Sequence, residues 1–183
     1  MQLKIAEIKD IENILKLHAK YQLATIAEDD KKDGFVTTGF SKEELADIIT
    51  LEQGIFIAVE DDVMSASWAY WSKWPMFAFM IKDLPKLTYL GQTLSVDNSY
   101  QYGPVCIDKS VRGSGLLEKL FDFALESMSK RYPILVTFVN KINERSFAAH
   151  KRKLGLDVIQ EFEFNNNKYY EMVYDTSKRV LEK

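Results

Sequence analysis

The sequence predicts a single mixed α/β domain, in which a mostly antiparallel sheet is flanked by helices. Segments with the strand period of two and segments with the helical period near 3.6 alternate along residues 1–183. A hydrophobic content of 46% can fill one sizeable core, and typical domains of about 100–200 residues leave no room for two. No internal repeat or low-complexity linker divides the chain.

The N-terminal part is predicted to form a strand and two helices. Residues 3–7 alternate as a strand does, and residues 11–18 place apolar side chains at helical spacing after Asp10, a typical capping residue. Residues 27–40 are rich in charge and glycine and predict a loop at the rim of a substrate site. The run 41–44, Ser-Lys-Glu-Glu, is a capping box that begins the second helix.

A hairpin and an insertion are predicted next. Residues 55–60 and 63–71 have strand character and flank Asp61-Asp62, which suits a hairpin turn. Residues 72–98 are less regular and are interpreted as an insertion, with a helix that begins at the Trp-Pro pair 74–75.

The C-terminal half is predicted to contain the central strands. Residues 100–107 form a strand bent at Gly103-Pro104, and residues 116–128 carry the apolar stripe of a helix that covers a core. Residues 134–138 are a continuous apolar run that suits a central strand. A final hairpin is predicted from strand-like segments around an asparagine triplet: residues 156–164 and 169–174, joined by 165–167.

Composition excludes several classes of protein. There are 24 Lys and Arg against 27 Asp and Glu, so no basic field favours nucleic acid. The most apolar region, residues 63–81, is interrupted by Lys73 and Pro75 and does not predict a membrane span. The single Cys106 cannot form an internal disulfide, and the N-terminal residues alternate charged and apolar side chains, so we expect no secretory leader. We expect a cytoplasmic protein that binds neither nucleic acid nor membrane.

Residues 108–117, Asp-Lys-Ser-Val-Arg-Gly-Ser-Gly-Leu-Leu, carry the strongest functional signal. Gly113 and Gly115 let the backbone approach a ligand, and the helix that follows offers first-turn amides and a positive dipole end. This predicts a site for an anion, most simply a phosphate. Two motifs that also bind phosphate fit poorly. The loop of nucleotide hydrolases needs Lys followed by Ser or Thr after its last glycine, and two leucines stand there. The dinucleotide-binding motif needs a third glycine, and Glu118 occupies that position.

Two blocks together resemble the Gcn5-related N-acetyltransferase (GNAT) family. Residues 112–117, Arg-Gly-Ser-Gly-Leu-Leu, resemble its acetyl-coenzyme A signature, with Leu117 in place of a small residue. Residues 140–156 resemble its later motif, with Asn143 before a helix, a small residue within the helix, His150 about two turns on and a glycine exit into a strand.

The resemblance implies acetyl-coenzyme A as co-substrate, no metal, and direct transfer of the acetyl group to a primary amine. It also implies that the sheet splays into a V between the strand before the turn and the strand after the central helix, with the pantetheine arm in the wedge. Cofactor binding would then fall to ten residues: Val105, Cys106, Ile107, Arg112, Gly113, Ser114, Gly115, Leu116, Asn143 and Ser146.

The catalytic groups are less defined. His150 stands where many relatives carry a tyrosine that protonates the departing thiolate, and an unperturbed pKa of about 6.5 suits a general acid; its alternative is a packing role. Cys106 lacks a nearby His–acid pair and is interpreted as a small core residue rather than a nucleophile. The residues alone leave several candidates for the base: Tyr102, Asp108, Glu28, Asp29 and Asp30.

Two side-chain groups have alternative interpretations. One aromatic set is expected in the core, although cation–π contacts with an amine are the alternative: Trp68, Tyr70, Trp71, Trp74, Phe77 and Phe79. One basic set is expected to be a solvated helix face, or to meet the 3′-phosphate of the cofactor: Lys141, Arg145, Lys151, Arg152 and Lys153.

The sequence therefore predicts an acyltransferase, specifically an N-acetyltransferase that acts on a small-molecule or peptide amine. A non-catalytic acyl-coenzyme A sensor or interaction module on the same fold is the alternative, and an unrelated nucleotide-binding domain is a more distant one. The identity of the acceptor and a homodimer paired through the last strands are left open.

Overall fold

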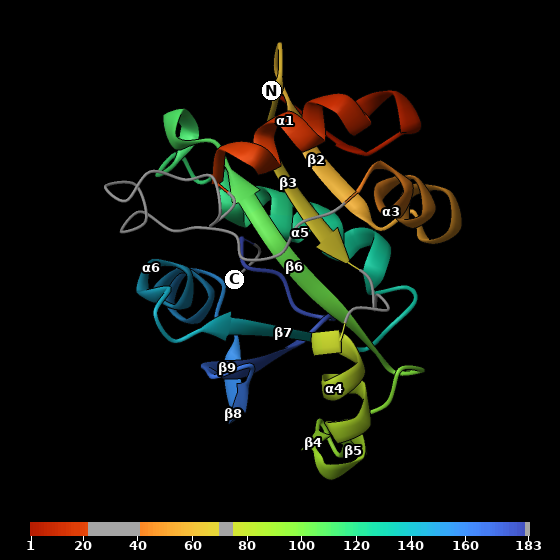
Figure 1. The fold of residues 1–183 in the computed structure, drawn as a ribbon, viewed down its shortest axis with the longest axis vertical. Helices are drawn as coiled ribbons and strands as arrows, with labels where there is room; N and C mark the ends of the chain where they lie inside the picture. The colour runs from red at the N-terminus through yellow and green to blue at the C-terminus, as the bar shows by residue number, and fades with distance from the viewer. Residues whose placement is uncertain (22–40, 70–74, 182–183) are drawn as a thin grey trace. The chain divides into compact units, whose positions relative to one another are not determined.

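The computed structural model describes residues 1–21, 41–69 and 75–181, and the other residues are a thin grey trace in Figure 1. The chain divides into two compact units. The first unit comprises Met1–Ala69 and Gly103–Ala124, and the second comprises Tyr70–Tyr102 and Leu125–Lys183. The strands form a seven-stranded sheet in the order β1-β2-β3-β6-β7-β9-β8, which confirms the mixed, mostly antiparallel α/β sheet. The single-domain organisation stays a prediction.

The first unit contains the N-terminal elements and the junction that carries the glycine turn. Its elements are β1 (Gln2–Ile5), η1 (Ile8–Asp10), α1 (Ile11–Tyr21), α3 (Lys42–Asp47), η2 (Ile48–Glu52), β2 (Ile55–Val59), β3 (Val63–Ala69), the end of β6 (Ser99–Ile107), η4 (Lys109–Val111) and the start of α5 (Leu116–Met128). The predicted capping box is confirmed, because Ser41 Oγ accepts from Glu44 N at 3.1 Å. The Asp10 carboxylate instead accepts from Glu7 N at 2.8 Å, so it caps η1 and not α1.

Both faces of β2 are covered in the first unit. The stretch from Ile55 to Ala58 is fully buried at four consecutive positions, although successive strand residues face opposite sides. Phe123 of α5 packs edge-on against Phe56 with ring centroids 6.2 Å apart. Ile14 and Leu17 of α1 are buried as well, which fits the predicted apolar stripe of that helix.

The second unit holds the insertion and the C-terminal strands. Its elements are α4 (Pro75–Asp83), η3 (Leu84–Lys86), β4 (Thr88–Tyr89), β5 (Gln92–Thr93), the start of β6, the end of α5, β7 (Ile134–Asn140), α6 (Glu144–Ala148), η5 (Ala149–Lys153), β8 (Asp157–Phe164) and β9 (Asn167–Asp175). The helix expected in the insertion is confirmed, whereas the β4–β5 hairpin that turns at Leu90 and Gly91 was not foreseen. The final turn is tighter than predicted: Asn165 and Asn166 have positive φ, and Asn167 already belongs to β9.

Two helices cover opposite faces of the strands in the second unit. Phe77 of α4 packs edge-on against Phe138 at 5.8 Å, and Phe147 of α6 stacks on Tyr170 at 4.2 Å. Phe138 is paired with Glu171, the chain neighbour of Tyr170, so these two contacts lie on opposite sides of the sheet. The core beneath α4 is built from buried side chains: Phe77, Met80, Leu84, Leu87, Leu94, Ile134, Val136 and Val173.

The middle of β6 is irregular, as the sequence predicts. The peptide bond between Gly103 and Pro104 is cis, and Gly103 has a φ of 107°. Parallel pairing of β6 with β7 extends only as far as Gln101 opposite Val136, although β7 continues to Asn140. A ladder that ends part-way along two strands is what a splay requires.

Candidate functional site

The predicted phosphate turn lies in the first unit, between β6 and α5. After η4 the chain passes through Gly113 and Gly115, whose φ values of 79° and 84° fall in the left-handed region that favours glycine. A Cβ on Gly113 would meet nothing within 4 Å, so the backbone conformation rather than crowding requires glycine. Ser114 Oγ donates to Val111 O at 2.5 Å, and α5 begins at Leu116. The first-turn amides of a helix lack internal partners, and an anion site at this turn stays a prediction.

The strand segment before the turn has one inward side chain. Val105 and Ile107 are half-buried, whereas Cys106 is buried and its Sγ donates to Leu17 O at 3.7 Å. Burial raises the pKa of Cys106 to about 12, so it is a neutral thiol at physiological pH. This confirms that Cys106 is a small core residue, and backbone pairing of this segment with a pantetheine arm stays a prediction.

Arg112 makes intramolecular contacts beside the turn. Its Nε donates to Ile107 O at 3.1 Å, and its guanidinium carbon lies 4.9 Å from the ring centroid of Tyr21, the last residue of α1. The Tyr21 hydroxyl accepts a hydrogen bond from Lys109 N at 2.8 Å. These contacts hold the segment that leads into the glycines, so Arg112 has a structural task beside any contact with an anion.

Asp108, one of the candidate bases, is buried at the end of β6, because only 9% of it is exposed. Its carboxylate accepts from Lys20 Nζ at 2.9 Å, from Ser110 N at 3.0 Å and from Ser110 Oγ at 2.7 Å. Burial alone would raise the pKa of Asp108, but these hydrogen bonds outweigh burial and hold it at about 2. Such a carboxylate is a poor proton acceptor near neutral pH.

Three predicted residues lie together at α6 in the second unit. Asn143 is the N-cap, because its Oδ1 accepts from Ser146 N at 3.3 Å, as the sequence predicts. His150 Nδ1 lies 2.7 Å from Ser146 O and 3.3 Å from Ser146 Oγ. The helix continues as the π-helical turn η5, a feature that the sequence does not reveal.

The surroundings of His150 define its protonation state. A carbonyl oxygen can only accept, so the 2.7 Å contact places the proton on Nδ1 and leaves Nε2 with a lone pair in the neutral ring. Only 7% of His150 is exposed, and this burial lowers its pKa below the usual 6.5 despite the hydrogen bond to Ser146 O. The resting ring is therefore neutral at pH 7, and its Nε2 is a proton acceptor.

Tyr102 lies next to His150 in the same unit. The two rings meet edge-on with centroids 5.9 Å apart, and Tyr102 is buried. Burial raises the pKa of Tyr102 far above its usual value of 10, so its hydroxyl stays protonated. Its carbonyl accepts from Gln101 Nε2 at 2.7 Å and from Thr137 Oγ1 at 2.6 Å, where the ladder between β6 and β7 has ended.

The structure thus gathers the predicted residues in two groups. One group in the first unit contains the strand segment and the turn: Val105, Cys106, Ile107, Arg112, Gly113, Ser114, Gly115 and Leu116. The other group in the second unit surrounds α6: Tyr102, Asn143, Ser146 and His150. The candidate bases Glu28, Asp29 and Asp30, with the rim loop 27–40, lie outside the described residues.

The described aromatic residues of the predicted cluster have different environments. Phe77 is buried in the core, whereas Phe79 is 38% exposed and lies beside Phe162 and Phe164 at centroid distances of 5.6 and 5.4 Å. The side chains of four members lie outside the described residues: Trp68, Tyr70, Trp71 and Trp74. Among the basic residues, Lys141 pairs with Glu161 and lies over Tyr170, while Lys151, Arg152 and Lys153 are exposed as expected.

Sequence reasoning missed a buried carboxylate in the second unit. Glu171 is 1% exposed, and its Oε1 accepts from Gln160 Nε2 at 2.8 Å, while the same amide donates to Asp83 Oδ2 at 2.7 Å. Burial raises the pKa of Glu171 to about 7, and the nearby Asp83 adds to the shift. The signal was a single Glu in the otherwise apolar alternation of residues 169–174, which propensity alone does not distinguish from an exposed position.

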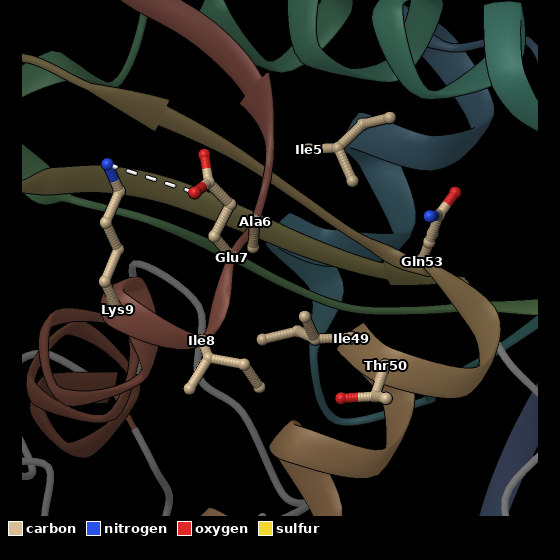
Figure 2. Close-up of a pocket in the computed structure, with 8 residues that line it drawn as sticks. All are labelled: Ile5, Ala6, Glu7, Ile8, Lys9, Ile49, Thr50 and Gln53. Atoms are coloured by element: carbon tan, nitrogen blue, oxygen red, sulfur yellow. Dashed lines mark ion pairs between the residues drawn. The ribbon is translucent and has the colours of Figure 1, made fainter.

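A separate hollow of about 630 Å³ in the first unit contains none of the predicted site residues. It is lined by residues from β1, η1 and the α3–η2 segment: Ile5, Ala6, Glu7, Ile8, Lys9, Ile49, Thr50 and Gln53. Figure 2 shows the isoleucines bordering it and the ion pair between Lys9 and Glu7 at one side.

Within residues 1–21, 41–69 and 75–181, no three His, Cys, Asp or Glu side chains gather as potential metal ligands. In the same ranges no helix has the length and apolar character needed to cross a bilayer.

Comparisons with known proteins identify the fold. No protein-family model matches the sequence, and neither does any curated protein. Three solved structures illustrate the similarity. An N-acetyltransferase from Staphylococcus aureus Mu50 is 16% identical, with 96% of this chain and 98% of that chain covered and a TM-score of 0.61. A GNAT-like decarboxylase, GphF, in complex with isobutyryl-CoA is 14% identical, with 96% and 100% covered and a TM-score of 0.63.

The third structure is yncA, a putative acetyltransferase from Salmonella typhimurium with acetyl-CoA; it is 12% identical, with 100% of this chain and 97% of that chain covered and a TM-score of 0.61. The chain therefore has the fold of the Gcn5-related N-acetyltransferases. At these identities the similarity establishes the fold, and the residues of the site must supply the argument for function.

Proposed function

We propose that this protein is an acyl-coenzyme A-dependent acyltransferase that transfers an acetyl group from acetyl-coenzyme A to a primary amine. The carrying observation is the left-handed pair Gly113 and Gly115 between β6 and the start of α5. On this fold, such a turn suits the pyrophosphate of a coenzyme A thioester, because backbone amides and the helix dipole both favour a diphosphate.

The proposed cofactor site uses backbone more than side chains. The amides from Gly113 to Leu116 would hold the pyrophosphate, and the backbone of Val105–Ile107 would pair with the amides of the pantetheine arm. In the second unit, Asn143 caps α6 and fixes Ser146, which in turn holds His150 through its carbonyl. We therefore assign Asn143 and Ser146 to positioning of the thioester end.

The proposed reaction is a direct attack of the neutral amine on the thioester carbonyl. The new C–N bond forms, the C–S bond breaks and coenzyme A leaves as a thiolate, while one proton must leave the attacking nitrogen. In neutral His150 the unprotonated Nε2 can accept that proton. The general-acid role that the sequence suggests would instead need an imidazolium, which burial disfavours at pH 7.

Binding and turnover test the proposal separately. Calorimetric titration with acetyl-coenzyme A should show one site per chain, and the absence of binding at high micromolar protein would refute the proposal. A panel of amines, amino acids and peptides should then release free thiol, monitored with a disulfide reagent. Binding without release of thiol from any amine would favour the non-catalytic acyl-coenzyme A module.

Several attributes of the proposed enzyme follow from its class. The acceptor is proposed to be a small-molecule or peptide amine, since the similar structures include a putative phosphinothricin N-acetyltransferase and the NatC complex bound to Gag peptide and CoA. A cytoplasmic location, independence of nucleic acid and membrane, and a homodimer paired through the last strands remain proposals; gel filtration with light scattering tests the last.

A further inference from the structure

Two consecutive residues at the end of α1 make three contacts with the segment just before the glycine turn. Lys20 Nζ lies 2.9 Å from Asp108 Oδ2, the Tyr21 hydroxyl accepts from Lys109 N at 2.8 Å, and the Tyr21 ring lies 4.9 Å from the Arg112 guanidinium carbon. All of these residues belong to the first unit. We call this set, Lys20 and Tyr21 with Asp108, Lys109 and Arg112, the α1 latch.

Two of the residues that Lys20 and Tyr21 contact, Asp108 and Arg112, are also hydrogen-bonded to the backbone. Asp108 N donates to Met64 O at 2.8 Å, which anchors the latch to β3, and the Asp108 carboxylate accepts from Ser110 N at 3.0 Å. Arg112 Nε donates to Ile107 O at 3.1 Å. The chain from Ile107 to Arg112 is thus fixed at several points immediately before the first left-handed glycine.

Such fixation has a direct consequence for a site built of amides. A turn that contains two glycines has many accessible conformations, and its amides bind an anion tightly only when their conformational freedom is already restricted. The contacts of Lys20 and Tyr21 lie within five residues of Gly113 and restrict the chain on its N-terminal side. Helix α5 restricts it on the other side.

We propose that Lys20 and Tyr21 are positioning residues for the pyrophosphate of the coenzyme A thioester: they act through Asp108, Lys109 and Arg112 and hold the glycine turn in its binding conformation. This inference rests on the proposed function, and it adds two residues of α1 to the determinants of cofactor affinity. They are distant in sequence from the turn, and neither needs to touch the cofactor.

The test compares two ligands that differ in the pyrophosphate. Coenzyme A contains it, whereas pantetheine lacks it, so a positioning role must weaken the first and spare the second. Tyr21→Phe removes the hydrogen bond to Lys109 N and should weaken coenzyme A about fivefold, the worth of one hydrogen bond. Tyr21→Leu also removes the ring from Arg112 and should weaken it about 15-fold. Lys20→Met, which loses a half-exposed ion pair, should weaken it about threefold.

A matched pair elsewhere serves as the control. Arg131 lies over Tyr132 with its guanidinium carbon 5.4 Å from the ring centroid, in the second unit. Tyr132→Phe and Tyr132→Leu should leave the affinity for coenzyme A within twofold of the wild type. Hydrogen exchange of the Lys109 amide in the protein without ligand should be faster in Tyr21→Phe, which tests the latch without the cofactor.

The outcomes separate the two proposals. Failure of the wild type to bind coenzyme A would overturn the proposed function and the positioning role with it. Normal binding by the wild type together with unchanged affinity in both Tyr21 variants would overturn the positioning role alone. Equal weakening of coenzyme A and pantetheine, with a lower melting temperature, would also overturn it, because that pattern belongs to a general loss of structure.

Discussion

The two units differ in how they treat charged groups. In the first unit, hydrogen bonds from Lys20 and Ser110 outweigh partial burial and hold the pKa of Asp108 at about 2. In the second unit, burial without a counter-charge raises the pKa of Glu171 to about 7 and lowers that of His150. Asp108 therefore keeps its charge around neutral pH, whereas Glu171 changes its charge there and His150 is neutral. This contrast suits the proposed anion site in the first unit and the proposed proton transfer in the second.

The variant with the largest expected effect tests the assignment of proton transfer to His150 in the second unit. His150→Gln should lower kcat about 1000-fold, the middle of the range for general acid–base catalysis, with a smaller change in the KM for acetyl-coenzyme A. In the wild type, the rate should rise with pH through an apparent pKa below 6.5, because the neutral ring is the active form and its folded pKa is lowered. The variant should lose this rise.

Lys151→Gln, at the exposed neighbouring position, is the control and should keep both the rate and its pH profile. A wild-type rate that falls as the pH rises through the same range would reverse the role of His150 from acceptor to donor. Steady-state kinetics between pH 5 and 9 decide the sign.

The next effect concerns the anion site of the first unit. The double variant Gly113→Val, Gly115→Val forces side chains into φ values of 79° and 84°, at a cost of about 1–2 kcal/mol for each residue. The turn should adopt another conformation, and the affinity for coenzyme A should fall about 100-fold by calorimetry. Gly91→Val imposes the same strain at a φ of 73° in the β4–β5 hairpin of the second unit and should leave the affinity unchanged. Equal affinity in the double variant would remove the turn from the site.

A smaller effect tests the buried carboxylate of the second unit. Because the folded pKa of Glu171 is raised from 4.5 to about 7, its contribution to stability is present below pH 4.5 and is lost as the pH rises through 7. Glu171→Gln, which avoids the buried charge, should raise the free energy of unfolding at pH 8 by roughly 2 kcal/mol and change it little at pH 5. Denaturant unfolding at both pH values measures this, with Glu163→Gln at an exposed position of β8 as the control. A variant that is less stable at pH 8 would contradict the assignment.

The smallest effect tests the paired carboxylate of the first unit. The folded pKa of Asp108 is lowered from 3.8 to about 2, so its stabilisation is present above pH 4 and disappears as the pH falls toward 2. Asp108→Asn should cost about 1 kcal/mol at pH 7, since Lys20 is half-exposed and solvent screens the pair. The difference between wild type and variant should vanish near pH 2. Glu12→Gln, which breaks an exposed ion pair with Lys42, should cost less at every pH.

Local signals in the sequence were enough for most elements. The apolar stripe of residues 116–128 predicts α5 with its observed bounds, and the Ser41 capping box and the Asn143 cap occur as expected. The β4–β5 hairpin was missed because its strands have two residues each, too few to show a period. The π-helical turn after α6 was missed because the pattern of exposed and buried positions along five residues does not distinguish it from an α-helix.

The candidate site divides in the same way. The glycine turn can be recognised from the sequence because a left-handed backbone favours glycine, and this preference is a property of each residue by itself. The latch residues Lys20 and Tyr21 could not be recognised from the sequence, because each lies 88 positions from its hydrogen-bond partner in the segment before the turn. Likewise, nothing local distinguishes a buried Glu171 from an exposed one.

The sequence by itself determined most of the elements, the mixed sheet and the need for glycine in the turn, since these depend on backbone preferences and on the spacing of apolar residues. The tertiary structure decided that Asp108 is paired with Lys20, that Glu171 is buried without a counter-charge, and which nitrogen of His150 carries the proton. Those outcomes depend on solvation and on partners supplied by distant segments, and a one-dimensional pattern does not contain either.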